Sequence, residues 1–456
     1  MGISSLGVGS SILTQDVLDQ LRAADEAGQI VPVDLSIANE NDKKDALKII
    51  DANMQNLIDS IDDIKRHGLY DEREATVSGS SVEVSAIINS DVQEFSLDVI
   101  TLATKQIEQS GAFGAKDEKI AAAGTSGTFD LNIDGASIAN ITYDEETSLE
   151  DLKNLINNEA GDKVSATIIQ INDTDFRLFI SSVETGDSQD ISISDNGTGL
   201  SANLDGGMST IQTGVDSHFQ FNGQDIYRSS NVVDDLASGL TITLKEVGSS
   251  DVSVAQNRDT IMEKFDNFMK HYNAAVTELD KMTKASVDSD EKGIFSGEST
   301  IKNMKRTIES MVNTIGGGVG YINDYGFDID KDGEMTLDKD VLNTALDTNP
   351  QNVEAFFAGG TFTNADSSTT EVDGAFTEFS DILQGYTNYN ATLDLFTTAI
   401  TDKISALEDK KITATERLDA KYAIMKKQYA AYDLMISKLS SASSMFTQMA
   451  NTENSY

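Results

Sequence analysis

Apolar residues recur at heptad spacing near both ends of this chain, and that pattern limits the folds it can adopt. Steps of three and four residues place such side chains on one face of a helix, as in a coiled coil or helical bundle. Any one such stripe is also typical of an ordinary helix facing a protein core. Two of them at opposite ends favour terminal helices that pack on each other as a stalk. The stripe residues, our candidate helix-packing and assembly sites, are Leu47, Ile50, Met54, Leu57, Ile61, Ile64, Leu393, Phe396, Ile400, Leu418, Tyr422, Met425, Tyr429, Tyr432, Ile436 and Leu439.

Scarce proline permits these helices to be long. The chain has only two prolines, Pro32 and Pro350, and proline is the residue that most disrupts a helix interior. The C-terminal pattern starts at Tyr386 and Tyr389. A single helix over 375–449 would be roughly 110 Å long, which requires a partner helix or a bundle.

The middle of the chain is different in character. From about residue 75 to 256, β-branched residues alternate with polar ones, which predicts strands, and Asn222-Gly223 predicts a two-residue hairpin turn. Residues 128–205 form a self-contained pattern of strands around a helix over Leu149–Asn157. This block contains 16 acidic and 3 basic residues, so a strongly negative surface is expected.

Together these patterns predict an α+β multidomain protein in which long terminal helices form a coiled-coil-like stalk and β-rich head domains are inserted between them. Helical spacing also returns over residues 257–290 and 298–315. The expected domains are a flexible N-terminal leg segment (1–36), the N-terminal helix of a helical base (37–70), the first part of a β-rich head domain (71–127), an inserted α+β head domain (128–210), the second part of the β-rich domain (211–257), the helical base with a β-hairpin near 321–337 (258–417) and a C-terminal leg helix (418–456).

Charge and residue usage exclude several classes of function. Acidic residues outnumber basic ones 76 to 34, for a net charge of −42, so nucleic acid and anionic membrane surfaces are not expected partners. The chain has no cysteine, which excludes disulfides and thiolate sites. The N-terminal sequence lacks the basic and apolar regions of a signal peptide, and no stretch of about 18 apolar residues predicts a membrane span.

Motifs that could suggest chemistry are incomplete. The segment from Asp328 to Gly333 resembles the start of a calcium-binding loop, but Lys339 occupies the twelfth position, where that loop requires a bidentate acid. A hairpin turned at Asp332-Gly333 is the expected structure instead. The three histidines, His67, His218 and His271, lie in unrelated segments. No catalytic, cofactor-binding or metal site is expected, and the chain is not expected to be an enzyme.

Several segments resemble a known family. The start of the chain, Gly2 to Ser10, the run from Phe221 to Asn231 and the following Asp235 to Leu244 are similar to the filament cap proteins of bacterial flagella, the FliD or hook-associated protein 2 family. The segment from Tyr325 to Pro350 shares this resemblance. Residues 128–195 are similar to a small repeat of flagellins and hook-associated proteins, so the inserted head domain is expected to be flagellin-like. The likeness spans nearly the whole chain, with looser similarity in the central domains.

The resemblance implies a function. A member of this family caps the distal tip of the filament as a ring, commonly a pentamer, and promotes the folding and insertion of exported flagellin. It also implies type III export without a cleaved signal peptide, an export chaperone as a partner and an extracellular location on the flagellum. No cofactor is implied. Alternatives are another flagellar axial or junction protein, or a secreted adhesin, since an exposed cap head could mediate cell adhesion.

The C-terminal leg is slightly basic in an otherwise acidic chain. Residues 402–438 contain 8 basic and 6 acidic residues. Our hypothesis is that Lys421, Lys426 and Lys427 help the leg to bind the filament or neighbouring subunits.

Overall fold

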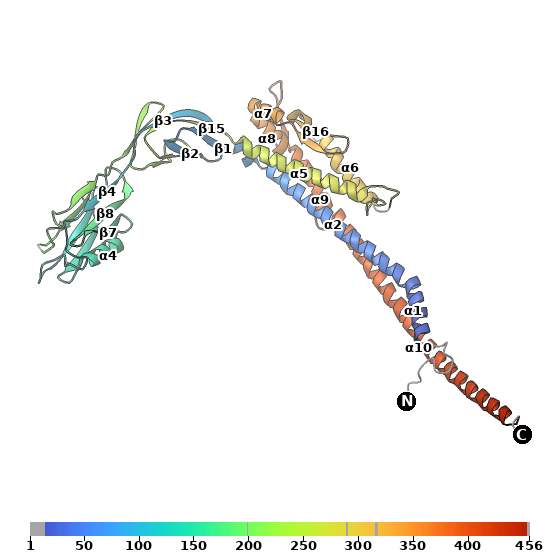
Figure 1. Cartoon of the computed structure of the whole chain (residues 1–456). Coiled ribbons are helices and arrows are strands. Elements are labelled where there is room, and N and C mark those ends of the chain that lie inside the picture. The colour runs from blue at the N-terminus through green and yellow to red at the C-terminus, as the bar shows by residue number, and fades with distance from the viewer. Residues whose placement is uncertain (1–13, 198, 289–290, 315–317, 454–456) are drawn as a thin grey trace. The chain divides into compact units, whose positions relative to one another are not determined.

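The computed structural model describes residues 14–197, 199–288, 291–314 and 318–453 (Figure 1). It divides the chain into two compact units. Unit 1 joins the residues up to Leu69 with those from Asp259 onward, and unit 2 contains Tyr70–Arg258. Unit 1 is mostly helical and unit 2 is mostly strand, which confirms the predicted α+β multidomain fold with long terminal helices.

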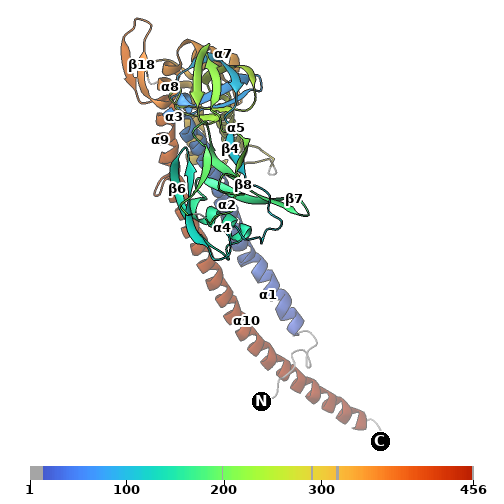
Figure 2. The ribbon, with the colours of Figure 1, turned by 90° about the vertical axis from the view of Figure 1, so that its left-hand side faces the viewer.

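Three helices form the elongated part of unit 1. They are α1 (Gln15–Gln29), α2 (Val31–Ile64) and α10 (Thr392–Glu453). Figures 1 and 2 show α10 alongside α2 and then alongside α1, and both helices contact it. The structure departs from the predicted flexible segment over 1–36, because residues 15–36 are helical. The Thr14 hydroxyl caps α1 by accepting a hydrogen bond from the Val17 amide at 3.3 Å. Residues 1–13 of that prediction lie outside the described residues.

The predicted helix over 375–449 is interrupted. Helix α9 (Ala375–Thr387) ends four residues before α10 begins. In between, Asn390 adopts a left-handed conformation with φ of 59°, and the Asp394 carboxylate accepts a hydrogen bond from its amide at 2.9 Å. Asparagine tolerates that conformation better than most residues, so the chain can restart a helix here. Beyond this point α10 is continuous, so the expected domain boundary at residue 418 falls inside one helix.

The base of unit 1 is built around phenylalanines. Phe265 and Phe268 lie on α5 (Arg258–Thr283), and their ring centroids lie 4.8 Å from Phe357 and 4.7 Å from Phe376, respectively. The hairpin of β16 (Phe327–Ile329) and β17 (Met335–Leu337) adds Phe327 to this cluster. The remaining base elements are α3 (His67–Asp71, at the boundary with unit 2), α6 (Ser299–Thr314), η1 (Ile322–Tyr325), α7 (Lys339–Thr348), α8 (Pro350–Ala358), β18 (Gly360–Thr363) and β19 (Thr369–Val372).

Unit 2 contains two hydrophobic cores. The first lies between a five-stranded and a three-stranded antiparallel sheet. The expected turn at Asn222-Gly223 joins β11 to β12, and both residues have positive φ, at 48° and 79°. In sheet order the strands are β1 (Arg73–Ser78), β15 (Gly248–Gln256), β3 (Gln93–Thr101), β11 (Ser217–Phe221) and β12 (Gln224–Arg228), then β13 (Val232–Val233), β14 (Leu240–Leu244) and β2 (Val82–Ala86).

The second core belongs to the inserted domain. Helix α4 (Leu149–Ala160), capped by Ser148 and Asp151, covers it together with a four-stranded and a three-stranded sheet. The domain is wider than the expected 128–210, because β4 and β10 pair within its four-stranded sheet. Its strands are β10 (Ser209–Gln212), β4 (Lys105–Gln109), β8 (Asp175–Thr185) and β7 (Val164–Asn172), and β6 (Ala136–Asp144), β5 (Ser126–Ile133) and β9 (Ile191–Asp195).

Candidate functional site

The N-terminal stripe is buried inside unit 1. Its members lie on α2, which packs against α10 and α9, and each is at most 2% exposed. They are Leu47, Ile50, Met54, Leu57, Ile61 and Ile64. Because neighbouring helices of the same chain already cover these side chains, they hold the base together. A role for these residues in assembly between copies of the chain stays a prediction.

The C-terminal stripe changes from buried to exposed along α10. Its buried members are Leu393, Ile400, Leu418 and Tyr422. Its half-buried members are Phe396, Met425 and Tyr429. Its exposed members are Tyr432, Ile436 and Leu439, at 56%, 39% and 66%. The two halves of the stripe therefore have different environments, although their sequence pattern is continuous.

Helix α1 covers the middle of α10 through a small apolar cluster. Leu18, Leu418 and Tyr422 are buried in it, and Ile30, Met425 and Tyr429 pack around them. Leu18 is the one residue of α1 that is buried. The weak apolar pattern of this segment did not single Leu18 out as a packing residue.

Charged groups surround this cluster. The Asp25 carboxylate of α1 accepts hydrogen bonds from the Lys421 ammonium and the Tyr422 hydroxyl, both at 2.6 Å. These bonds hold the pKa of Asp25 below its usual value, and the bond from Lys421 has the larger effect. Burial and the nearby Asp25 raise the pKa of Tyr422 to about 12. Arg22 contacts Asp419 at 2.5 Å. Lys421, which we expected to face other molecules, is thus occupied within the chain.

A buried carboxylate joins α2 to α10 further along. Glu40 is 6% exposed, and its carboxylate lies 2.7 Å from Lys403 and 3.4 Å from Lys43. Burial alone would raise the pKa of Glu40, but the hydrogen bond from Lys403 and the charge of Lys43 bring it below its ordinary value. A further ion pair joins Lys411 to Asp34 at 2.7 Å. Sequence patterns gave no signal for the pairs of Glu40 with Lys403 and of Asp34 with Lys411, whose members lie more than 300 residues apart.

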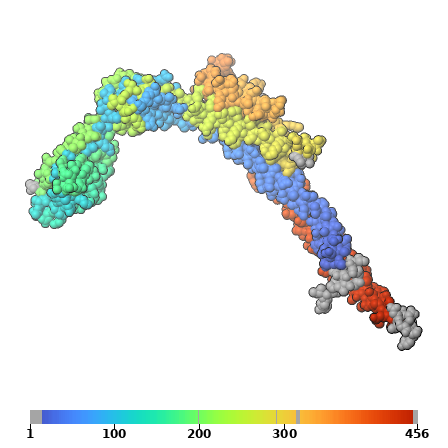
Figure 3. Space-filling view, in the orientation of Figure 1, coloured from blue at the N-terminus to red at the C-terminus, as the bar shows by residue number. Residues whose placement is uncertain are grey.

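The end of α10 is both apolar and basic. Figure 3 shows this end, in red, extending past α1 within unit 1. Residues 421–453 contain four lysines and two acidic residues, the reverse of the balance in the whole chain. Exposed apolar residues outside the predicted stripe also lie here, and they are Ile424, Leu434, Met435, Met445, Phe446 and Met449. We refer to residues 424–449 as the leg tip.

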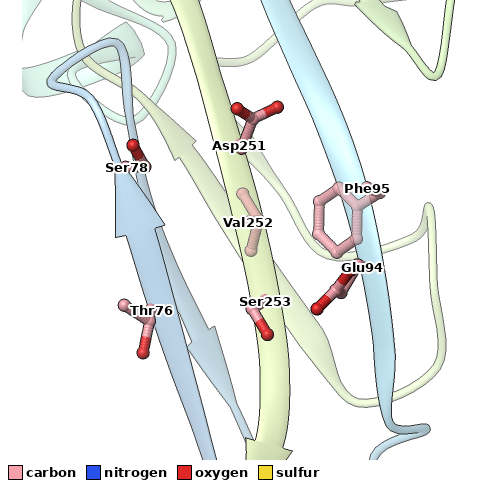
Figure 4. Close-up of a pocket in the computed structure, with 7 residues that line it drawn as sticks. All are labelled: Thr76, Ser78, Glu94, Phe95, Asp251, Val252 and Ser253. Atoms are coloured by element: carbon pink, nitrogen blue, oxygen red, sulfur yellow. The ribbon is translucent and has the colours of Figure 1, made fainter.

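Surface pockets elsewhere in the described residues show no arrangement of side chains typical of a catalytic site. One of about 520 Å³ lies over β1, β15 and β3 of unit 2, where Glu94 and Asp251 flank serine, threonine and valine side chains (Figure 4). No group of three histidine, aspartate or glutamate side chains among the described residues could hold a metal ion. Nor does any described helix combine the length and apolar character needed to cross a bilayer.

The segment that resembles a calcium loop is a hairpin. The Asp330 carboxylate accepts hydrogen bonds from the amides of Glu334 and Asp332, both at 2.9 Å, and these bonds lower its pKa. Lys339, at the position where a calcium ligand would stand, contacts Asp266 of α5 at 2.6 Å. The lysine therefore links the start of α7 to α5 within the base.

Comparisons with known proteins agree with this architecture. A family model described as the C-terminus of flagellar hook-associated protein 2 matches residues 214–441, half of the chain, and the model of its N-terminus matches residues 10–106. A flagellar hook-associated protein 2 of Helicobacter pylori (strain J99) is 30% identical over 257 residues, which cover 54% of this chain and 37% of that protein. The chain thus spans well under half the length of this relative.

Two matches from Escherichia coli cover more of their own length. The flagellar hook-associated protein 2 of strain K12 is 24% identical over 478 aligned residues, which cover 99% of this chain and 99% of that protein. The crystal structure of the D1-D2-D3 domains of the E. coli flagellar cap protein FliD aligns with a TM-score of 0.58 and 21% identity, covering 78% of this chain and 99% of that one. The second match shows a shared fold. Since both family models match this chain in order, it belongs to the flagellar hook-associated protein 2 family.

Proposed function

We propose that this chain is the cap at the distal tip of a bacterial flagellar filament. There it assembles into a ring, with five subunits as the expected number, and promotes the folding and insertion of exported flagellin. It reaches that extracellular place through the flagellar export apparatus without a cleaved signal peptide, with an export chaperone as a partner. Its role is structural rather than catalytic.

The observation that carries this proposal is the leg tip. A water-soluble helix normally buries its apolar face, and an exposed apolar surface of this kind indicates a partner. In the leg tip, the stripe members Tyr432, Ile436 and Leu439 are exposed, whereas the stripe of α2 is already used inside unit 1. In a member of this family, the filament tip and neighbouring copies of the chain are the partners that we propose for this surface.

The first test is the mass of the full-length protein in solution, measured by light scattering over a range of concentrations. We expect a closed oligomer that is lost when Tyr432, Ile436 and Leu439 are changed together to serine. The matched control changes Ile87, Ile88 and Val92, which are at least as exposed on average but lie in unit 2. A ring that survives the leg-tip changes, or is lost equally in the control, would contradict the assembly role.

The second test is capping itself. A motile bacterium without its own cap protein would express the chain, and polymerised flagellin would be compared with flagellin released into the medium. Lys426→Glu with Lys427→Glu should increase release, because both lysines are exposed at the leg tip. Lys421→Glu is unsuitable, since it would also break the contact with Asp25. If the chain binds hooks but never reduces flagellin release, the junction-protein alternative gains instead.

The adhesin alternative has no support in the described residues. Neither the hollow in Figure 4 nor any other described feature specifies a host ligand, so we do not propose adhesion as a function.

A further inference from the structure

Sulfur is distributed unevenly over the surface of this chain. The sequence has 13 methionines and no cysteine. Six described methionines are buried, and Met208, Met269 and Met425 are half-buried. The exposed ones are Met435, Met445 and Met449, at 60%, 60% and 61%, and all three belong to the leg tip. Within the described part of the chain, every exposed methionine therefore lies in a 15-residue stretch of one helix.

Two of these sulfur atoms also lie on the main apolar face of the leg tip. Starting from Met435, Leu439 follows four residues later, Phe446 eleven and Met449 fourteen. At 3.6 residues per turn these positions fall within one face of a helix. Leu439 and Phe446 are 66% and 72% exposed. A chemical change at the methionines would therefore alter the polarity of the surface to which the assembly role was assigned.

We propose that Met435, Met445 and Met449 form a reversible oxidation site for two-electron oxidants of the peroxide and hypohalous acid class. With a peroxide, the lone pair of the thioether sulfur attacks one oxygen, a sulfur–oxygen bond forms, the O–O bond breaks, and the proton of the attacked oxygen passes to the leaving oxygen. With hypochlorous acid, the sulfur first takes the chlorine while hydroxide leaves; water then displaces chloride as the sulfur–oxygen bond forms, with net release of one proton. The sulfur is oxidised by two electrons to the sulfoxide, and the oxidant is reduced to water or chloride. With no thiol in the chain to react first, these exposed thioethers are the most accessible soft nucleophiles among the residues that the structure describes.

Oxidation weakens the leg tip as a docking surface. A sulfoxide replaces a flexible apolar side chain with a polar one that resists burial. Because Met435 and Met449 share the main apolar face, the effects of their oxidation add there, and Met445 adds a third polar group within the same 15 residues. This consequence rests on the proposed assembly function, whereas the selectivity of the oxidation does not. Methionine sulfoxide reductases, with a thiol as the reductant, would restore the apolar surface.

The first experiment tests selectivity alone. The full-length protein is treated with limiting hydrogen peroxide, and the oxygen gained by each methionine is followed over time by peptide mass spectrometry. We expect Met435, Met445 and Met449 to react about tenfold or more faster than Met54 and Met304, which are buried in the base. Uniform oxidation, or faster reaction at the buried sites, would overturn the proposal.

The second experiment tests the consequence with a matched pair of variants. One changes the three leg-tip methionines to leucine, a substitution of similar volume, and the control changes Met208 and Met269 to leucine. Peroxide should dissociate the oligomer of the control protein and of the unaltered protein, and reductase treatment should restore it. After peroxide, the leucine leg-tip variant should retain the fraction of oligomer that the same variant shows before treatment. Equal dissociation of both variants would overturn the switch, and absence of any oligomer before treatment would count against the assembly function while leaving the selectivity result standing.

Discussion

Replacing Leu18 by alanine tests how α1 is held against α10. Leu18 is 3% exposed and is the buried residue that α1 contributes to the cluster with Leu418 and Tyr422. A helix of 15 residues is marginal in water by itself. The ion pairs around the cluster are mostly exposed, and such pairs contribute about 0–1 kcal/mol each. The helical state of α1 thus depends mainly on this apolar contact.

The expected loss follows from the size of the cluster. Leucine-to-alanine changes in cores cost about 2–5 kcal/mol, and a small cluster whose surroundings can collapse belongs near the lower value, about 2 kcal/mol. Since about 1.4 kcal/mol corresponds to a factor of ten, amide hydrogen exchange within α1 should accelerate roughly thirtyfold. Exchange over the buried face of α2 should not change.

Hydrogen exchange followed by mass spectrometry resolves these segments. The control is Leu35→Ala, because Leu35 is 66% exposed on α2, and it should leave exchange in α1 unaltered. If Leu18→Ala accelerates exchange in α1 less than about threefold, the apolar contact does not maintain the helix and the reasoning is refuted.

Three further predictions concern unit 1. Glu40→Gln should lower the stability at neutral pH and flatten the loss of stability in acid. The pKa of Glu40 is lowered in the folded protein, so its contribution to stability is complete above its pKa in the unfolded chain, about 4.3, and is lost as the pH falls through its pKa in the folded protein. An unchanged dependence of stability on acid pH, measured by urea titration, would contradict this prediction. Asp51→Asn should do the opposite, stabilising the protein at pH 7 with a gain that vanishes in acid, because burial and Asp394 raise the pKa of Asp51; the same pH series of denaturation midpoints measures this. Phe268→Ala should cost about 3–5 kcal/mol and lower the melting temperature of unit 1, with circular dichroism of the strands in unit 2 as the internal control.

The stripes were predictable to different degrees for physical reasons. The buried face of α2 could be predicted from the sequence because its apolar residues recur at helical spacing and are almost completely buried. The interruption between α9 and α10 could not be predicted, because the left-handed Asn390 and its hydrogen bond to Asp394 leave the spacing of the apolar residues unbroken. Helix α1 was not predicted, because one buried leucine does not produce a repeating apolar pattern in the sequence.

Contacts between distant segments escaped prediction altogether. The bond between Asp25 and Lys421 joins residues 396 positions apart, and nothing in a local pattern pairs one lysine with one aspartate. The edges of the inserted domain were misplaced for a similar reason. Strand β4 pairs with β8 across more than 60 intervening residues, so its membership is decided by a partner rather than by its own sequence.

The continuity of α10 has a mechanical consequence. One helix of 62 residues carries buried contacts near its start at Leu393 and an exposed apolar surface near its end. Along an unbroken helix each residue advances the azimuth by 100°, so the direction in which the leg tip faces is indexed to the base by residue count alone. Adding or removing one residue between them would turn that face by more than a quarter of a circle without disturbing either end. The number of residues in the helix therefore sets the direction in which the leg tip faces relative to the base.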